Sequence, residues 1–247
     1  MKTIAIINQK GGVGKTTSAL ELAYLFGEKG KTLVIDLDGQ RNLSMYTGAK
    51  LDAPGIYEVL NAEILPEDAI QHVYTFDLLI SNKNLANSAK EFGEPDDIYL
   101  LKDVLENLDY DYVIIDNAPA RSPLLYMTYI ASDAVIPITE CDDGSIEGIN
   151  ELYTDMQRFI KRRTSNAKIL GILMTKYEKT TMHDVALDTL NELAEQIGTE
   201  VFNTKIRKAI AVSESKTARE PVNVYQRYNN AALDYRHLTD EIIAKLG

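Results

Sequence analysis

Cysteine is almost absent from this sequence of 247 residues, in which Cys141 is the only one. A lone cysteine excludes an intramolecular disulfide framework and a cluster held by several thiolates, and it fits a reducing cytoplasm. The three histidines, His72, His183 and His237, are scattered and lack the spacing of a metal site. We therefore expect a protein whose chemistry depends on neither disulfides nor cysteine or histidine ligands.

The sequence also lacks long apolar runs. No run approaches the roughly 18 residues that a membrane-spanning helix needs. The first residues lead directly into a strand-like segment, which predicts no signal peptide and no N-terminal helix-turn-helix domain. Linkers and internal repeats are missing as well, so we expect one domain over residues 1–247. A net charge of −11 argues against a uniformly basic surface for nucleic acid, although it allows a local basic patch.

What the sequence does contain is an alternation of apolar strand-like runs with helix-like stretches. This alternation predicts an α/β fold with a doubly wound, mostly parallel sheet and helices on both faces. We expect strands over residues 3–8, 31–38, 76–82, 112–116, 133–139, 168–175 and 201–204. We expect helices over residues 18–26 (closed by Gly30), 56–60, 67–72, 145–160, 183–197 and 230–246, another helical face within 91–111, and a basic loop after residue 204.

The first strand is followed by residues 9–17, QKGGVGKTT, which fit the phosphate-loop template G-x-x-x-x-G-K-[ST] except that Gln9 replaces the first glycine. The glycines let several backbone N–H groups point inward, and the positive end of the following helix strengthens this anion site. Lys15 can reach the β- and γ-phosphates of a nucleotide, and the Thr16 hydroxyl can bind Mg²⁺. The predicted nucleotide-binding residues are Gly11, Gly12, Val13, Gly14, Lys15, Thr16 and Thr17.

Aspartates end two of the other predicted strands. Asp36 and Asp38 lie at the end of the strand over residues 31–38, where strand alternation places both side chains on one face. Asp116 follows four apolar residues, in the form of a Walker B element. Ligands bind at the carboxyl edge of such sheets, and neighbouring carboxylates need a cation. We therefore expect Thr16, Asp36 and Asp116 to form a magnesium site.

The stretch from Lys10 to Thr17, KGGVGKTT, resembles the deviant P-loop of the ParA/MinD family of ATPases, and other segments extend the resemblance over nearly the whole chain. Residues 36–42 (DLDGQRN) are similar to the family's D-x-D-P-Q-G-N segment, and residues 116–119 (DNAP) to its D-x-P-P segment. Residues 213–222 are similar to its S-E-A…P-V segment. The positions that depart from the first two patterns are Gly39, Arg41 and Ala118.

The resemblance, closest to the small Soj-like ParA proteins, implies an ATP-dependent homodimer that uses ATP and Mg²⁺ and binds DNA without sequence specificity. Hydrolysis would be slow until a ParB-like partner stimulates it. In that family the extra lysine, here Lys10, reaches the partner's phosphates and would act as an arginine finger does. By the same resemblance Asp38 positions the attacking water, so that Lys10, Lys15 and Asp38 are the catalytic candidates. The implied location is the cytoplasm, on the nucleoid, in DNA segregation or positioning.

Basic residues cluster at two places in the sequence, and their contacts with phosphates would give salt-dependent DNA binding that a dimer doubles. The predicted DNA contacts are Arg162, Arg163, Lys205, Arg207, Lys208, Lys216 and Arg219. Residues 206–209 read IRKA where the family has I-P-R-N. The last ten residues carry two acids and one lysine, so we expect a core-packing helix rather than a membrane anchor.

Two other functions remain open. A P-loop metabolic ligase or synthetase can share this loop and sheet, but it should also show a pocket for a small molecule, and the sequence contains no motif for one. A nucleotide-dependent scaffold that positions a protein cargo would bind nucleotide without retaining DNA. The cargo and the activating partner are not identified by the sequence.

Overall fold

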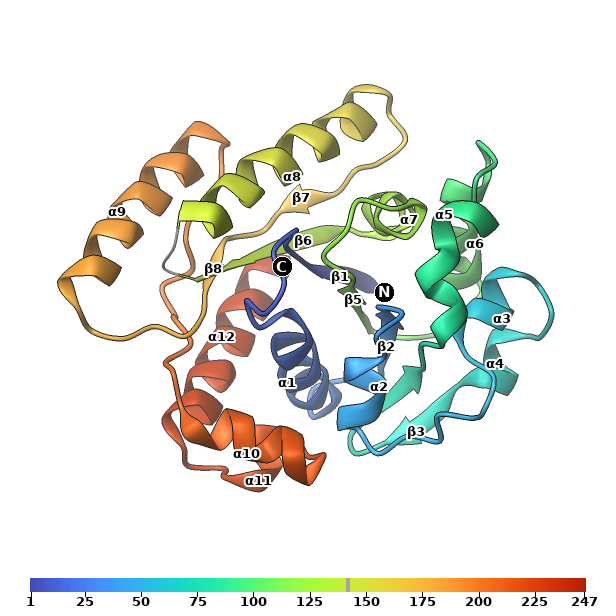
Figure 1. Cartoon of the computed structure of the whole chain (residues 1–247), viewed down its shortest axis with the longest axis horizontal. Coiled ribbons are helices and arrows are strands. Elements are labelled where there is room, and N and C mark those ends of the chain that lie inside the picture. The colour runs from blue at the N-terminus through green and yellow to red at the C-terminus, as the bar shows by residue number, and fades with distance from the viewer. Residues whose placement is uncertain (141–142) are drawn as a thin grey trace.

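Figure 1 shows the computed structural model of the chain, which describes residues 1–140 and 143–247. Cys141, on which the expectation of a reducing environment depends, lies outside the described residues. Within the described ranges, no helix combines the length and the apolar character needed to cross a membrane.

A single sheet of eight strands runs through the described part of the chain in the order β3-β4-β2-β5-β1-β6-β7, with β8 beside β6. The strands are β1 (Lys2–Ile7), β2 (Thr32–Leu37), β3 (Gln71–Val73), β4 (Phe76–Leu79), β5 (Tyr112–Asn117), β6 (Ala134–Thr139), β7 (Lys168–Ile169) and β8 (Leu173–Met174). Every pair of neighbours is parallel except β3 and β4. The predicted doubly wound, mostly parallel α/β fold is therefore confirmed.

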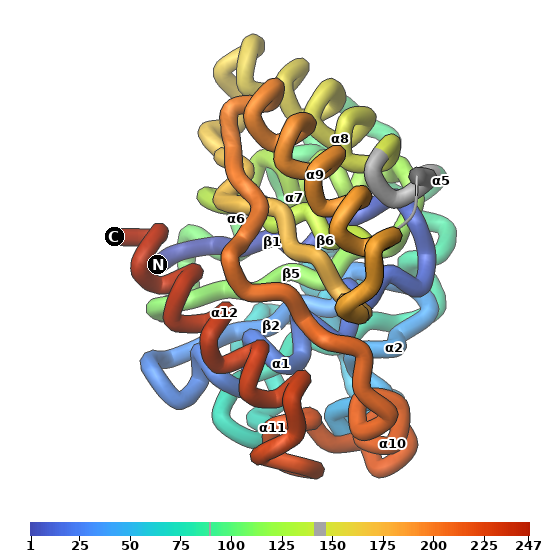
Figure 2. The backbone as a smooth tube through the Cα atoms, turned by 90° about the vertical axis from the view of Figure 1, so that its left-hand side faces the viewer, coloured from blue at the N-terminus to red at the C-terminus, as the bar shows by residue number. Residues whose placement is uncertain are grey.

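Helices cover both faces of this sheet (Figures 1 and 2). They are α1 (Lys15–Gly27), α2 (Asn42–Tyr46), α3 (Ile56–Leu60), α4 (Pro66–Ala69), α5 (Ser88–Glu91), α6 (Leu100–Glu106), α7 (Pro123–Ala131), α8 (Asp143–Lys161), α9 (Thr181–Gln196), α10 (Ile210–Ala218), α11 (Val222–Tyr225) and α12 (Asn230–Leu246). Short 3₁₀ turns cover Lys83–Asn87 and Asp97–Tyr99. The unpredicted α7 begins with Ser122 as N-cap and Pro123 in its first turn, a helix-start signal that the sequence displays.

Alternation along the central strands divides the core between the two faces. On one face Ile4, Val34 and Ile114 pack against α1 and α12 in one buried cluster. On the other face Ile35 and Ile115 belong to a cluster with α3, α6 and α7. Because both faces are covered, the central strands are apolar throughout, and polar side chains appear where these strands end.

The predicted strand over residues 168–175 is interrupted. Val135 pairs with Ile169 and Ile138 pairs with Leu173, so this strand holds one residue more than β6 between the two pairs. Within the interruption, the N–H of Ile172 donates to Glu200 O (2.8 Å), and a side chain on Gly171 would collide with the Phe202 ring. The extra residue is a bulge that lets the segment around Phe202 approach the sheet.

Four other predictions were wrong in detail. The helix expected over 67–72 ends at Ala69, and Gln71–Val73 instead forms the antiparallel edge strand β3. The strand expected over 201–204 is reduced to a single bridge between Val201 and Ile172. The basic segment expected to be a loop contains the helix α10. The first helix ends at Gly27 with Glu28 as its cap, so Gly30 does not close it.

A buried carboxylate joins the first helix to the C-terminal part of the chain. Glu21 of α1 accepts hydrogen bonds from the backbone N–H of Val222 (2.5 Å) and of Asn223 (3.1 Å), and from the Asn223 side-chain amide (2.9 Å). Burial raises the pKa of Glu21 to about 7, although these hydrogen bonds favour the ionised form. The contact holds α11, and with it the preceding α10, beside the helix that follows the phosphate loop.

This contact predicts a pH-dependent stability. The pKa of Glu21 is higher in the folded chain than in the unfolded one, so its contribution is complete below the unfolded pKa of 4.5 and is lost as pH rises through about 7. In the wild type, the Glu21 contribution should lower the free energy of unfolding by on the order of 3 kcal/mol between pH 5 and 8. Urea unfolding at several pH values should show that Glu21→Gln lacks this decrease. Glu28→Gln, which changes an exposed glutamate after the same helix, should keep the wild-type slope. An unaltered slope in the Glu21 variant would contradict the prediction.

Candidate nucleotide-binding site

The predicted phosphate loop connects β1 to α1 at the carboxyl edge of the sheet. Gly12 and Gly14 adopt left-handed backbone angles, with φ of 81° and 97°. Gly14 is also the N-cap of α1, so the free N–H groups of the first helical turn face the loop. Any L side chain at these two positions would be strained, which explains why the turn needs glycine there.

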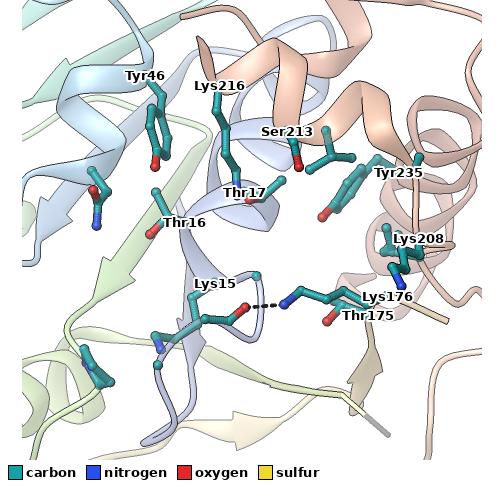
Figure 3. Close-up of a pocket in the computed structure, with 18 of the residues that line it drawn as sticks. Lys15, Thr16, Thr17, Tyr46, Thr175, Lys176, Lys208, Ser213, Lys216 and Tyr235 are labelled. Carbon is teal, nitrogen blue, oxygen red and sulfur yellow. Dashed lines mark hydrogen bonds between the residues drawn. The ribbon is translucent and has the colours of Figure 1, made fainter.

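Three side chains that follow the strands β1 and β8 hold this loop in place. The Asn8 side chain accepts a hydrogen bond from the Lys10 N–H (2.7 Å) and donates to Ile138 O. The Thr175 hydroxyl donates to Val13 O (2.6 Å). The Lys176 ammonium donates to Gly12 O (2.8 Å), the contact drawn as a dashed line in Figure 3. The backbone carbonyls of the loop are thereby engaged, which leaves its N–H groups for an anion.

Lys15 lies at the centre of the site and is almost fully buried. Its ammonium donates to Lys10 O (2.8 Å) across the loop. Burial lowers the pKa of Lys15, whereas the carboxylates of Asp116 and Asp38 act in the opposite direction. The structure therefore brings together the predicted phosphate-binding lysine and two of the predicted acids.

The acids Asp36 and Asp116 are register partners on the adjacent strands β2 and β5, and both are fully buried. Asp36 accepts hydrogen bonds from the Ser44 hydroxyl (2.7 Å), the Ser44 N–H (2.9 Å) and the Asp38 N–H (3.1 Å). Burial raises its pKa to about 6, with a smaller contribution from Asp38. Asp36 is thus supplied with donors from the protein, mainly from the start of α2.

Asp116 differs from Asp36 because neither of its carboxylate oxygens has a well-formed hydrogen bond in the described structure. The Thr16 hydroxyl is close enough to lower its pKa, but its geometry falls short of a normal hydrogen bond. Burial, and then the neighbouring Asp36, raise the pKa of Asp116 well above its usual value. Buried oxygens without donors mark a place where a cation would be stabilised.

The loop opens into a cavity of about 590 Å³. Its floor is formed by the loop residues Gly11, Gly12 and Gly14 and by Lys15, Thr16 and Thr17 of α1. Its opposite side comes from α2, α10 and α12 and from the segment between β8 and α10. Asp38 lines it and accepts a hydrogen bond from the Gln40 N–H (2.9 Å). Figure 3 shows Tyr46, Ser213, Lys216 and Tyr235 on the side of the cavity away from Lys15, and the apolar Ile206 and Val212 also line it. One end of the cavity is therefore suited to phosphates and the other to a larger, partly apolar group.

Several of these lining residues were missed by the sequence analysis. Thr175 and Lys176 follow β8 directly, as Asp116 ends β5, so a polar residue after an apolar strand was the available signal. Tyr46 and Tyr235 lie about 190 residues apart in the sequence and line the same cavity only through the packing of α2, α10 and α12. No local pattern could have identified this pair.

The predicted DNA contacts do not form one surface. Arg162 and Arg163 are exposed just after α8, at the opposite end of the molecule from α10 (Figures 1 and 2). Arg207 is held by the Asp234 carboxylate at 2.6 Å, and Lys208 lies 3.3 Å from Glu178. Lys205 is half-buried and donates to Asn203 O, and Arg219 is exposed at the end of α10. Lys216 points into the cavity and not to the outer surface (Figure 3).

Comparisons with known proteins agree with this geometry. Residues 1–170 match a family model described as an AAA domain. The chromosome-partitioning ATPase Soj of Thermus thermophilus is 30% identical over 248 residues, which cover 100% of this chain and 97% of Soj. Apo McdA from Cyanothece has a TM-score of 0.89 at 24% identity over 100% of both chains, a likeness of fold alone. A cobyrinic acid a,c-diamide synthase from Mycobacterium smegmatis with bound ADP and magnesium has a TM-score of 0.84 at 26% identity, over 100% of this chain and 95% of that one.

The family follows from two of these matches. The AAA-domain model covers well over half of the chain, and the match to Soj extends over nearly the full length of both proteins. The glycine loop that follows Lys10, the motif that first pointed to this family, lines the cavity just described. The chain therefore belongs to the ParA/MinD family of P-loop ATPases, whose members include the partition ATPases.

Proposed function

We propose that this protein is a ParA-like partition ATPase. It binds Mg·ATP in the cavity above the phosphate loop, forms an ATP-dependent homodimer, binds DNA without sequence specificity, and releases it after a hydrolysis step that a ParB-like partner stimulates. The observation that carries the proposal is that the nearly buried Lys15 lines a cavity of nucleotide size, with the carboxylates of Asp116 and Asp38 close enough to act on its ammonium. The name of the Thermus relative, a chromosome-partitioning ATPase, supports the assignment.

The groups around Lys15 fit a magnesium ion. Asp116 presents buried oxygens without donors, and the Thr16 hydroxyl lies beside it. Asp36 already accepts three hydrogen bonds, so it would orient the surroundings of the ion rather than coordinate it. In residues 1–140 and 143–247 no group of three His, Cys, Asp or Glu side chains could hold a metal alone. Phosphate oxygens and water would complete the coordination, and bound Mg²⁺ would neutralise charge on the phosphates.

Two residues at the rim would act in hydrolysis. Asp38 is half-buried beside the phosphate loop, where one carboxylate oxygen is fixed by the Gln40 N–H and the carboxylate can orient a water molecule. Lys10 is exposed at the start of the loop, where a second copy of the chain could receive its side chain. A cation supplied from the partner would stabilise the charge that develops on the phosphates, so the dimer alone would form the complete site.

A partition ATPase, a protein-cargo scaffold and a metabolic synthase would all bind a nucleotide, but only the first would also bind DNA. The similarity to a cobyrinic acid a,c-diamide synthase leaves a metabolic reaction as an alternative. The similarity to McdA concerns the fold alone. The partition assignment is favoured because the named relative that matches over its full length is a partitioning ATPase. ATP-dependent retention of DNA distinguishes this assignment from a protein-cargo scaffold and from a synthase.

Loss of Lys15 should abolish tight nucleotide binding. Lys15→Ala removes the buried ammonium at the centre of the phosphate loop, and the affinity for ATP, measured by calorimetry, should fall at least about 30-fold. Lys2→Ala removes an exposed lysine from the far end of β1 and should leave the affinity unchanged. Equal ATP affinities for the Lys15 variant and the wild type would show that the loop does not bind phosphate.

Loss of Asp38 should separate binding from hydrolysis. Asp38→Ala should retain ATP but release phosphate at least about 100-fold more slowly, because the group that orients the water is missing. Phosphate release under single-turnover conditions measures the step directly, and Asp52→Ala, at an exposed aspartate, serves as the control. Hydrolysis at the wild-type rate would remove Asp38 from the mechanism.

Binding to non-specific duplex DNA tests the central proposal. With ATP, but not with ADP or without nucleotide, the protein should bind DNA, with an affinity that falls steeply as salt increases. Because the basic residues lie in two separate groups, Arg162→Glu/Arg163→Glu and Lys205→Glu/Lys208→Glu should be compared as two double variants. The double variant that removes the DNA contacts should bind DNA more weakly. Its slope of log affinity against log salt concentration should be smaller by about one unit for each DNA phosphate that is no longer neutralised.

Two outcomes would redirect the assignment. Absence of DNA binding with every nucleotide, in protein that still binds ATP, would favour a scaffold for a protein cargo or a metabolic enzyme. Full DNA binding by both double variants would place the DNA contacts elsewhere on the surface.

A further inference from the structure

Among the basic residues that line the cavity, Lys216 is the one that the phosphate-loop motif and the contacts described above leave without a role. It belongs to α10, and Figure 3 shows its side chain extending from that helix toward Thr16 and Thr17 at the start of α1. Burial lowers the pKa of its ammonium, and the nearby charge of Lys176 adds to the shift. The ammonium lies 5.8 Å from the centre of the Tyr46 ring.

The other cations that line the cavity are each engaged by an acceptor. Lys15 donates to Lys10 O, and Lys176 bonds Glu140 at 2.6 Å as well as Gly12 O. Arg207 bonds Asp234, and Lys208 faces Glu178. For the Lys216 ammonium, the described residues provide the face of Tyr46 and neither a carboxylate nor a hydrogen-bond acceptor. A half-buried ammonium in this position is costly unless an anion occupies the cavity beside it.

The position of Lys216 indicates which part of a nucleotide it would meet. Its helix also supplies Val212 and Ser213 to the cavity lining, and Figure 3 shows Ser213 and Tyr235 on the side away from Lys15, where the cavity suits the nucleoside. Lys15 lies on the other side of Thr16 and Thr17, toward the loop and the acids (Figure 3). The Lys216 ammonium reaches the cavity from the side of the nucleoside, so it would contact the phosphate next to the nucleoside rather than the terminal phosphates.

We propose that Lys216 binds the phosphate nearest the nucleoside and that it acts as a nucleotide-binding residue, not as a DNA contact. This inference depends on the nucleotide binding proposed above. A contact with the first phosphate is made equally by ATP and ADP, and it changes little during cleavage of the terminal phosphate. Lys216 therefore contributes uniform binding, which strengthens affinity without accelerating hydrolysis.

The attachment of α10 to the rest of the molecule is consistent with a nucleotide-binding role for Lys216. The segment that follows α10 is fixed to α1 through the Glu21 contacts with Val222 and Asn223. The same helix α1 begins at the phosphate loop, so Lys216 and the loop are carried by elements that are tied together. A cation held in place before the ligand arrives loses less conformational freedom on binding.

The test compares nucleotide affinities of Lys216→Met and wild-type protein for ATP, ADP and AMP by calorimetry. Methionine keeps a chain of similar length against Tyr46, and equal urea unfolding midpoints would verify that the variant is folded. All three affinities should fall by the same factor, between about 10-fold and 100-fold. Lys216→Arg should retain most of the affinity, and Arg219→Gln, which removes an exposed cation from the end of the same helix, should have no effect.

Each other outcome overturns the proposal. Loss of affinity for ATP alone would place the ammonium at the terminal phosphate, and unchanged affinities would show that it does not contact the nucleotide. Reduced DNA retention at saturating ATP with unchanged nucleotide affinity would make Lys216 a DNA contact. Wild-type protein that binds none of the three nucleotides would overturn the proposed function together with this inference.

Discussion

The structure around the site depends on the pairing of two buried acids. The parallel register of β2 and β5 places Asp36 beside Asp116 where both strands end, with both side chains fully buried. Burial raises the pKa of both groups, and the charge of Asp36 raises that of Asp116 further. The chain satisfies Asp36 with donors from α2 but leaves Asp116 without them. A cation at Asp116, from Lys15 and from a metal, is the remaining means of stabilising the ionised pair.

The phosphate loop is fixed by residues that follow two other strands, β1 and β8. Asn8 follows β1, Thr175 follows β8, and Lys176 stands directly after it, and each bonds the backbone of the loop. Lys176 itself adopts a left-handed φ of 53°, which costs free energy in a residue with a side chain. That cost is offset by its bonds to Gly12 O and Glu140. The loop thus has its shape before an anion binds, which reduces the conformational entropy lost on binding.

The sequence predicted the parts of this site that depend on local pattern. Strand, glycine loop and helix are adjacent in the chain, and Asp36 and Asp116 follow apolar runs, so the sheet and the floor of the cavity could be inferred. The far wall could not, because α10 and α12 reach the loop only through tertiary packing. The sequence also did not indicate which basic side chains face the solvent and which are paired or turned inward. Arg207 is neutralised by Asp234, which lies 27 residues later, and Lys216 turns inward although its sequence neighbourhood is polar. The bulge at Gly171 depends on Phe202, a contact that no periodicity displays.

The distribution of charge connects the nucleotide to the proposed DNA step. A net charge of −11 means that the field of the whole chain repels both nucleotides and nucleic acid at long range. Inside the cavity, Lys15 and Lys216 supply positive charge that attracts an anion locally, and the partial exclusion of water strengthens this attraction. The basic groups outside the cavity are smaller and more exposed, so salt screens them more strongly. Each group alone gives few phosphate contacts, and two copies of the chain on one duplex double them. The proposed DNA binding would therefore depend on dimerisation more than on any single residue, and a nucleotide that controls the proposed dimerisation would control DNA binding as well.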